Sequence, residues 1–442
     1  MFTRKDLIKL IIPLIIEQLL MVTIGFADSM MVSTVGEAAV SGVSLVDTLN
    51  ILLIGLFGAL ATGGAVVSAQ FLGNKDRKSA SKAGEQLIMA IMALSLIVMA
   101  ISLVFGKSIL ALIFGQVEAD VMGFSRTYLF YSALSFPFIA LYNACAALFR
   151  SMGNSKISMW TSFAMNIINL IFNSLFIFGF HMGVAGAALA TLFSRGFGAI
   201  LLYILLKNKK LDIHMGMIRN FRLDMTMIKR ILRIGVPNGL ENSVFQVGKI
   251  LVQGVTASLG TSAITANAVS GTIANMGVLP GSAMGLALIT VVGQCMGARD
   301  YEGVKRYTFN LMKYTYIIIS IWNLLIVIFL PFILKLYNLT PATLEITSKI
   351  TIYHCVLASI IWPLSFTLPN ALRATNDVKY TMWISMFSMW LFRIAFSYIL
   401  ALTFELGVFG IWVAMTIDWA FRSICFVTRF LKEKYKKNAM LP

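Results

Sequence analysis

The sequence predicts an all-α integral membrane protein with twelve transmembrane helices, arranged as two parallel-repeat six-helix bundles around a central cavity. Three observations predict this fold: the composition, apolar stretches along the whole chain, and an internal repeat. Hydrophobic residues make up 58% of the 442 residues, and charged residues only 12%. A soluble domain carries about 25% charged residues, so a chain this apolar exceeds what such a domain can bury.

The apolar stretches, separated by residues that interrupt membrane helices, give twelve predicted spans. Crossing roughly 30 Å of hydrocarbon takes about 20 helical residues, and several of the stretches are longer, so we expect tilted or kinked helices. The predicted spans are 8–33, 43–72, 85–105, 122–149, 156–179, 184–206, 228–258, 262–295, 304–334, 346–371, 379–402 and 408–431.

Basic residues are concentrated in alternate loops. Of the 36 Lys and Arg residues, 28 fall in the termini and one alternate set of loops, and four fall in the intervening loops. The positive-inside rule places the first set in the cytoplasm. We therefore expect a multi-pass protein of the cell (inner or plasma) membrane with both termini cytoplasmic. Because the net charge of +17 is spread over many loops, we expect no nucleic-acid partner.

The two halves of the sequence repeat each other. Pro13 pairs with Pro237 and Glu17 with Glu241, at a shift of 224 residues without a gap. Because each repeat holds an even number of spans, both enter the membrane from the same side. Transporters use such parallel repeats to form a cavity between two bundles. We expect an N-lobe at 1–206, a basic cytoplasmic connector at 207–227, and a C-lobe at 228–442.

A few polar side chains fall inside predicted spans, where a carboxylate costs about 2.5–3.5 kcal/mol. Glu17 and Asp28 are eleven residues apart on the first span, which places them on one helix face. Asn166, Asn169 and Asn173 share one face of the fifth span. Asp28 is the carboxylate that we expect to be functional, because polar residues of neighbouring helices could converge on it.

The seventh span is the most polar. Its polar residues follow a spacing of four, four, three and four, which makes one stripe along the helix, and Glu241 lies beside it. Such a stripe is expected to face water or a partner bundle, although single Asn and Thr residues in membrane helices often only hydrogen-bond a neighbouring helix. The stripe is Asn238, Asn242, Gln246, Lys249 and Gln253. The predicted substrate-cavity residues are Glu17, Glu241, Asn242, Gln246 and Lys249.

Three arginines in or near predicted spans favour structural roles. Asp418 and Arg422 are four residues apart in the last span, so we expect a structural ion pair. Arg195 and Arg393 are expected to extend toward the membrane surface or to pair helices.

Six motifs carry a family resemblance. They are PLIIEQLLMVTIGFADSMMVSTVG, AQFLGNKDRKSA, NLIFNSLFIFG, GVAGAALATLFSR, GVPNGLEN and ANAV. In this order they resemble the MATE (multidrug and toxic compound extrusion) family, and the resemblance covers nearly the entire chain. It implies twelve helices in two lobes around a V-shaped cavity. It also implies an antiporter that exports amphiphilic, often cationic, organic compounds and is driven by inward flow of Na⁺ or H⁺.

The resemblance also implies a cation-coupling site in the N-lobe. Family members build it from a first-helix Asp, two polar residues four apart on the fifth helix, and a sixth-helix Thr. Four oxygen-bearing side chains suit a hard cation such as Na⁺, and a carboxylate withdrawn from water could instead carry a proton near neutral pH. One branch of the family adds a tenth-helix carboxylate, where this chain has only His354. The matching residues, which would be the metal ligands under Na⁺ coupling, are Asp28, Asn169, Asn173 and Thr191.

Competing functions remain open at this point. A lipid or polysaccharide flippase of the same superfamily often has a more cationic cavity, which only Lys249, Arg195 and Arg393 could supply here. A major facilitator transporter also has parallel six-helix halves, but GNKDRKSASK lacks the later Gly and arginine pair typical of that class. A catalytic Ser/His pair, a metal cluster or a phosphate loop is not evident, so we expect neither a membrane enzyme nor a receptor. We expect no cofactor beyond the coupling ion, small amphiphilic substrates and membrane lipid as partners, and a monomer.

Overall fold

The computed structural model describes residues 2–115, 118–216, 222–337 and 339–437. These residues form long helices joined by short turns, and none of them lies in a strand. The chain divides into two compact units, Phe2–Gly239 and Leu240–Pro442.

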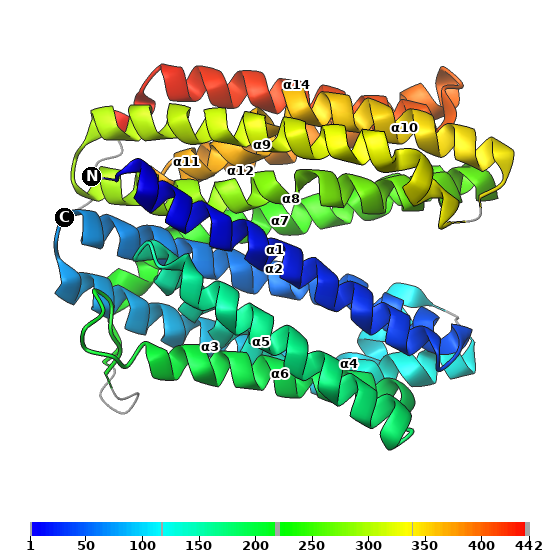
Figure 1. Cartoon of the computed structure of the whole chain (residues 1–442), viewed down its shortest axis with the longest axis horizontal. Helices are drawn as coiled ribbons and strands as arrows, with labels where there is room; N and C mark the ends of the chain where they lie inside the picture. Colours follow the sequence, from blue (N-terminus) through cyan, green and yellow to red (C-terminus); the bar gives the residue numbers. More distant parts are fainter. Residues whose placement is uncertain (1, 116–117, 217–221, 338, 438–442) are drawn as a thin grey trace. The chain divides into compact units, whose positions relative to one another are not determined.

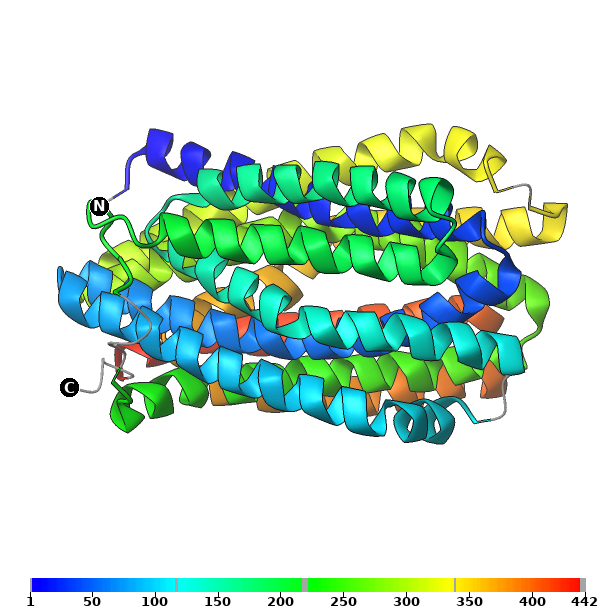
Figure 2. The ribbon, with the colours of Figure 1, turned by 90° about the horizontal axis from the view of Figure 1, so that it is seen from below.

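The first unit is a bundle of long helices. In Figure 2 the blue-to-green helices run along nearly one direction. Helix α4 packs against α2, α3 and α6, and α1 packs against α5. A π-helical turn, η1 (Ser174–Gly179), continues α5 without a break. The bounds are α1 (Arg4–Ser33), α2 (Glu37–Gly73), α3 (Arg77–Phe114), α4 (Ala119–Ser151), α5 (Ser155–Asn173) and α6 (Gly183–Leu205).

The second unit is more irregular. Helix α8 packs against α9, α10 and α11, and α10 and α11 together form one span bent by 60° around η3 (Pro363–Thr367). The eleventh span, Val378–Thr403, includes π-helical segments η4 (Met389–Ala395) and η5 (Ile399–Thr403). The bounds are α7 (Met225–Ser258), α8 (Thr261–Gly297), α9 (Tyr301–Lys335), α10 (Pro341–Ile360), α11 (Leu368–Ala374), α12 (Val378–Ser388), α13 (Phe396–Tyr398), α14 (Gly407–Leu431) and the 3₁₀ turn η6 (Lys434–Lys437) (Figure 1).

The described residues confirm an all-helical membrane fold. Eleven spans are long and apolar enough to cross a membrane when the bent pair α10 and α11 counts as one. The 34-residue helix α7 corresponds to the seventh predicted span and completes the expected twelve. It falls short of the others in apolarity because the polar stripe runs along it.

The internal repeat is visible in the turns that begin equivalent helices. Asp76 and Asp300 each accept a hydrogen bond from the backbone amide three residues ahead, at 2.9 and 2.7 Å, and so cap α3 and α9. This hydrogen bond holds the pKa of Asp76 below its ordinary value. The residues before them, Lys75 and Arg299, both have positive φ, at 61° and 57°. The two halves therefore share backbone conformation as well as residues at this turn.

The first unit extends past the predicted connector because α2 and the start of α7 touch at glycines. A Cβ built on Gly63 would lie 2.6 Å from the carbonyl oxygen of Ile231 and 2.9 Å from the backbone nitrogen of Gly235. Small residues let membrane helices approach this closely. This contact makes the first turns of α7 part of the first unit.

We predict that Gly63→Ala lowers the thermal stability of the detergent-solubilised protein, because the methyl group meets backbone that has little room to move. Overpacking of this kind costs about 1–3 kcal/mol. Gly58 lies on the same helix with nothing within 4 Å of a built Cβ, so Gly58→Ala is the matched control and should leave the melting temperature unchanged or raise it. Equal melting temperatures for the two variants would contradict the close contact.

Candidate functional site

Glu17 lies in a buried ion pair. Its side chain is 1% exposed, and its Oε1 lies 3.1 Å from Nη1 of Arg150 at the end of α4. The hydroxyl of Ser158 donates to the other oxygen at 2.7 Å. The pair thus joins α1 to α4 and α5.

Glu241 lies in an equivalent pair in the second unit. Its Oε1 lies 2.8 Å from Nη2 of Arg373 and accepts a hydrogen bond from Ser385 at 2.7 Å. Glu17 and Glu241 are related by the shift of 224, and Arg150 and Arg373 by 223. Neither glutamate lines the two cavities described next.

A cavity of about 320 Å³ lies within the first unit, between α1, α2, α4, α5 and α6. Asp28 and Thr191 line it, while Asn169 and Asn173 are buried and do not line it. The amide of Asn173 donates to Asp28 at 2.5 Å and to Asn169 at 3.0 Å. The amide of Asn169 in turn lies 3.5 Å from the Thr191 hydroxyl. The four residues expected to form a cation site are therefore joined in one chain of contacts.

One hydrogen-bond acceptor among these four side chains has no donor. The amide oxygen of Asn173 is buried and has no hydrogen-bond partner in the part of the chain that the structure describes. A buried acceptor left unsatisfied costs about 1–3 kcal/mol. The atom is thus available to a ligand that offers positive charge.

Asp47, which is not among the predicted site residues, lines the same cavity. Asp47 accepts a hydrogen bond from Asn50 at 3.2 Å and interacts electrostatically with Asp28 and Arg195. Arg195 donates to Ser135 at 2.7 Å and also lines the cavity. The rule that marked Asp28, a carboxylate inside an apolar span, would have found Asp47 within 43–72.

The charged residues in this cavity wall are two carboxylates and one guanidinium. With all three ionised, the wall carries one excess negative charge. One monovalent cation or one proton would neutralise it.

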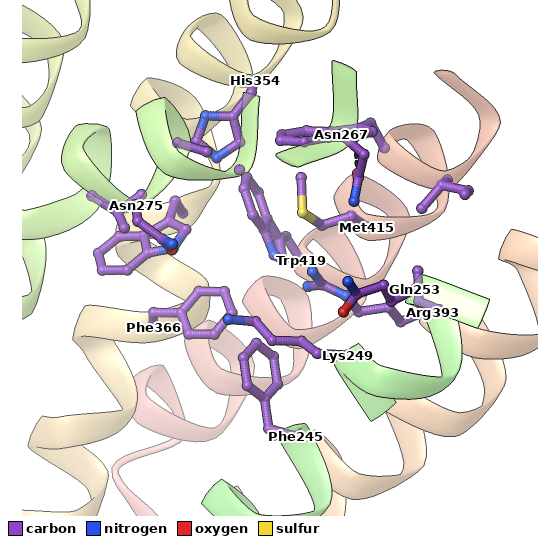
Figure 3. A pocket seen from close by; sticks show the side chains of 17 residues that line it. Phe245, Lys249, Gln253, Asn267, Asn275, His354, Phe366, Arg393, Met415 and Trp419 are labelled. Carbon is purple, nitrogen blue, oxygen red and sulfur yellow. Dashed lines mark hydrogen bonds between the residues drawn. The ribbon is translucent and has the colours of Figure 1, made fainter. Parts of the chain in front are cut away.

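A second cavity, of about 370 Å³, lies within the second unit between α7, α8, α10, η3, η4 and α14. Five Phe and Trp residues are part of its wall, and Figure 3 shows Lys249 running past Phe245 toward Phe366. The ammonium group of Lys249 lies 5.3 Å from the centre of the Phe245 ring. The guanidinium of Arg393 lies at 5.3 Å from the same centre.

The polar stripe of α7 reaches this cavity only in part. Lys249 and Gln253 line it, whereas Asn242 and Gln246 do not. Asn242 is exposed and Gln246 half-buried. Among the predicted substrate-cavity residues, Lys249 is thus the one that the cavity wall contains.

The ion pair expected at the end of the last span is confirmed. Asp418 lies 2.8 Å from Nε of Arg422 and 3.9 Å from Nη1 of Arg393, and it also accepts from Ser388. A single buried carboxylate thus serves two arginines.

A family model described as MatE matches the chain twice, at residues 13–175 and 237–399. The two matches are offset by 224 residues, the same shift that relates the two halves of the sequence.

Curated relatives match along almost the whole chain. The chain is 27% identical to a probable multidrug resistance protein NorM of Thermotoga maritima, covering 99% of this chain and 94% of that protein. It is 26% identical to an uncharacterized transporter, YisQ, of Bacillus subtilis, covering 98% and 96%.

Solved structures match the fold. One is a MOP superfamily transporter from Pyrococcus furiosus, described as having a binding pocket whose reverse polarity suggests a different function. It has a TM-score of 0.91 at 19% identity, covering 98% of this chain and 96% of that chain. A structure of MATE in the bent conformation has a TM-score of 0.89 at 20% identity, covering 98% and 96%.

We predict that Arg195→Met lowers the melting temperature of the purified protein, because it leaves Asp28 and Asp47 without a cation in the cavity wall. The loss should be about 1–3 kcal/mol or more. A second change, Asp47→Asn, should restore most of it by removing one of the two negative charges. Arg126→Met, at an exposed arginine of α4, is the control. An unchanged melting temperature in Arg195→Met would refute this charge balance.

Proposed function

The chain belongs to the MATE family of transporters, and from this premise we propose that it is an antiporter that exports amphiphilic organic compounds in exchange for Na⁺ or H⁺. The observation that supports coupling at this site is the polar chain around Asp28 in the first unit. Asp28, Asn169, Asn173 and Thr191 would supply the ligands of Na⁺, or Asp28 would carry the proton.

Two features of the site favour a single monovalent cation. The excess of one negative charge in the cavity wall matches one Na⁺ or one H⁺. The unpartnered amide oxygen of Asn173 lies on the residue that contacts Asp28, where a hard cation would find carboxylate, carbonyl and hydroxyl oxygens together. No cofactor is needed in this scheme.

The family resemblance favours cationic substrates, and the cavity beside Asp28 and Asp47 has the charge to receive them. A lipid or polysaccharide flippase is the second candidate function, because Lys249 and Arg393 give the other cavity the opposite charge. Both functions transport an amphiphile by alternating access between the two sides of the membrane.

We further propose that the protein resides in the cell membrane as a monomer, with both termini and the basic connector in the cytoplasm. The distribution of Lys and Arg over alternate loops supports this orientation.

Asp28→Asn tests the coupling site. The amide keeps the size of the side chain but removes the charge that binds a cation, so gradient-driven efflux from proteoliposomes should fall to the level of protein-free liposomes. Folding should survive, because a neutral amide costs less to bury than a carboxylate. The assay follows a fluorescent amphiphilic substrate under an imposed Na⁺ gradient and, separately, under a pH gradient.

Glu241→Gln is the comparison in the other unit, since its carboxylate is paired with Arg373 rather than placed in a cavity wall. It should impair efflux less than Asp28→Asn does. Full efflux by Asp28→Asn together with an inactive Glu241→Gln would move the coupling site to the second unit.

The orientation predicts a labelling pattern for single cysteines placed in a background without Cys145, Cys295, Cys355 and Cys425. Lys209 and Glu405 are both exposed and lie in loops of opposite predicted side. In intact cells a membrane-impermeant maleimide should label the Glu405→Cys protein. It should label the Lys209→Cys protein only after the cells are opened. The reverse pattern would invert the topology.

A further inference from the structure

The cavity of the second unit is lined by positive charge alone. Lys249 and Arg393 are in its wall, and none of the 17 residues that line it is Asp or Glu (Figure 3). In the first unit, by contrast, the wall carries more negative than positive charge. The two cavities therefore favour ligands of opposite sign.

The surroundings of the cavity do not balance this charge. Asp418 is the carboxylate that pairs with Arg393, and its closer partner is Arg422. No carboxylate among the described residues lies within ion-pair distance of Lys249, whose ammonium group lies over the Phe245 ring. Two arginines thus share one carboxylate, and Lys249 has none. Lys249 is exposed and lines the cavity. Because a charge inside a membrane span needs a counter-charge, the cavity is suited to an anion.

Two more atoms in the wall lack partners. The indole nitrogen of Trp419 is a buried donor without an acceptor in the described part of the chain, and Nδ1 of His354 also has no partner there. The His354 ring packs edge-on against Trp412 and Trp419, with ring centres 5.4 Å apart in each case. An unpaired indole N–H offers an acceptor-bearing ligand a hydrogen bond that the protein itself does not use.

The rest of the wall contains aromatic and aliphatic side chains together with three amides, Gln253, Asn267 and Asn275. Trp362 and Phe366 are stacked with ring centres 5.1 Å apart, and both line the cavity. A volume of about 370 Å³ lies within the roughly 300–1,000 Å³ of pockets that take drug-sized molecules.

We infer that the cavity of the second unit binds an organic anion, with its carboxylate, sulfonate or phosphate group at Lys249 and Arg393 and its apolar body against the aromatic wall. Lys249 contributes a charge-assisted hydrogen bond, and Trp419 contributes a neutral one. That such an anion is also exported rests on the proposed function, whereas its binding does not.

The test compares two probes of nearly equal size and opposite charge, naphthalene-2-sulfonate and trimethyl(2-naphthyl)ammonium. Radiolabelled forms of each are bound to the full-length protein in nanodiscs of phosphatidylcholine, without an ion gradient. The wild-type protein should bind the sulfonate more tightly than the ammonium compound. Lys249→Met should weaken sulfonate binding by about tenfold or more, as expected for loss of one charge-assisted hydrogen bond, and Lys249→Glu should reverse the preference.

Two variants separate a binding role from a structural one. Lys249→Arg keeps the positive charge and should retain most of the sulfonate affinity. Lys349 also lies over a phenylalanine ring, 4.6 Å from the centre of Phe409, but does not line the cavity, so Lys349→Met should bind the sulfonate as the wild type does. Equal affinity of wild type for both probes, or an equal loss in Lys249→Met and Lys349→Met, would overturn the inference.

The same assay distinguishes two sources of the anion. Adding phosphatidylglycerol to the nanodiscs should compete with the sulfonate if the natural ligand is an anionic lipid, and should have no effect if it is a soluble organic anion. Binding is measured here without transport. If Asp28→Asn left efflux unchanged and the wild-type protein still preferred the sulfonate, the antiport proposal would be wrong and the anion site would stand.

Discussion

A charged side chain inside a membrane span needs a partner, because hydrocarbon does not solvate it. Both halves of this chain meet that requirement with the same pair, a glutamate four residues after a proline and an arginine near the end of the fourth span of the repeat. The pairs are Glu17–Arg150 and Glu241–Arg373. Each pair joins the first and fourth spans of its repeat, and removing one member of a buried pair costs about 3–5 kcal/mol. The duplicated ion pair thus links the same two spans in each repeat, and neither member can be lost alone without cost.

In the walls of the two cavities, by contrast, the positive and negative charges do not pair completely. In the first unit Asp28 and Asp47 face one arginine, and in the second Lys249 and Arg393 have no carboxylate beside them in the cavity wall. Buried charge and unpartnered polar atoms lower stability, so a fold that retains them at one place points to a ligand there. Function in this protein is therefore inferred from the charges that the scaffold leaves uncompensated.

The sequence predicted the spans and the repeat well because both depend on local patterns of apolar residues. It predicted that Asp28 would lie among polar residues of the fifth and sixth spans, since the family motifs mark each of them. From the sequence, Arg150 and Arg373 were counted among the basic residues of the loops. In the structure they pair with Glu17 and Glu241, which lie 133 and 132 positions away. No periodicity reveals a contact across that separation. Asp47 was missed although the cost of a carboxylate in hydrocarbon applies to it as it does to Asp28.

Opposite charge in the two cavities constrains how transport could be coupled. A single ligand cannot neutralise a wall with excess negative charge and a wall with excess positive charge, so the coupling cation and an anionic substrate would occupy different units. Coupling then requires that each ligand bind one conformation of the transporter more tightly than another, and the two effects must be equal and reciprocal in free energy. The close contact between Gly63 of α2 and Gly235 of α7 bears on how the two units could respond to each other's ligands. The first part of helix α7, which includes Gly235, belongs to the first unit, and the same helix carries Lys249 in the second. A shift of this one helix would therefore change both the packing of the first unit and the cavity wall of the second.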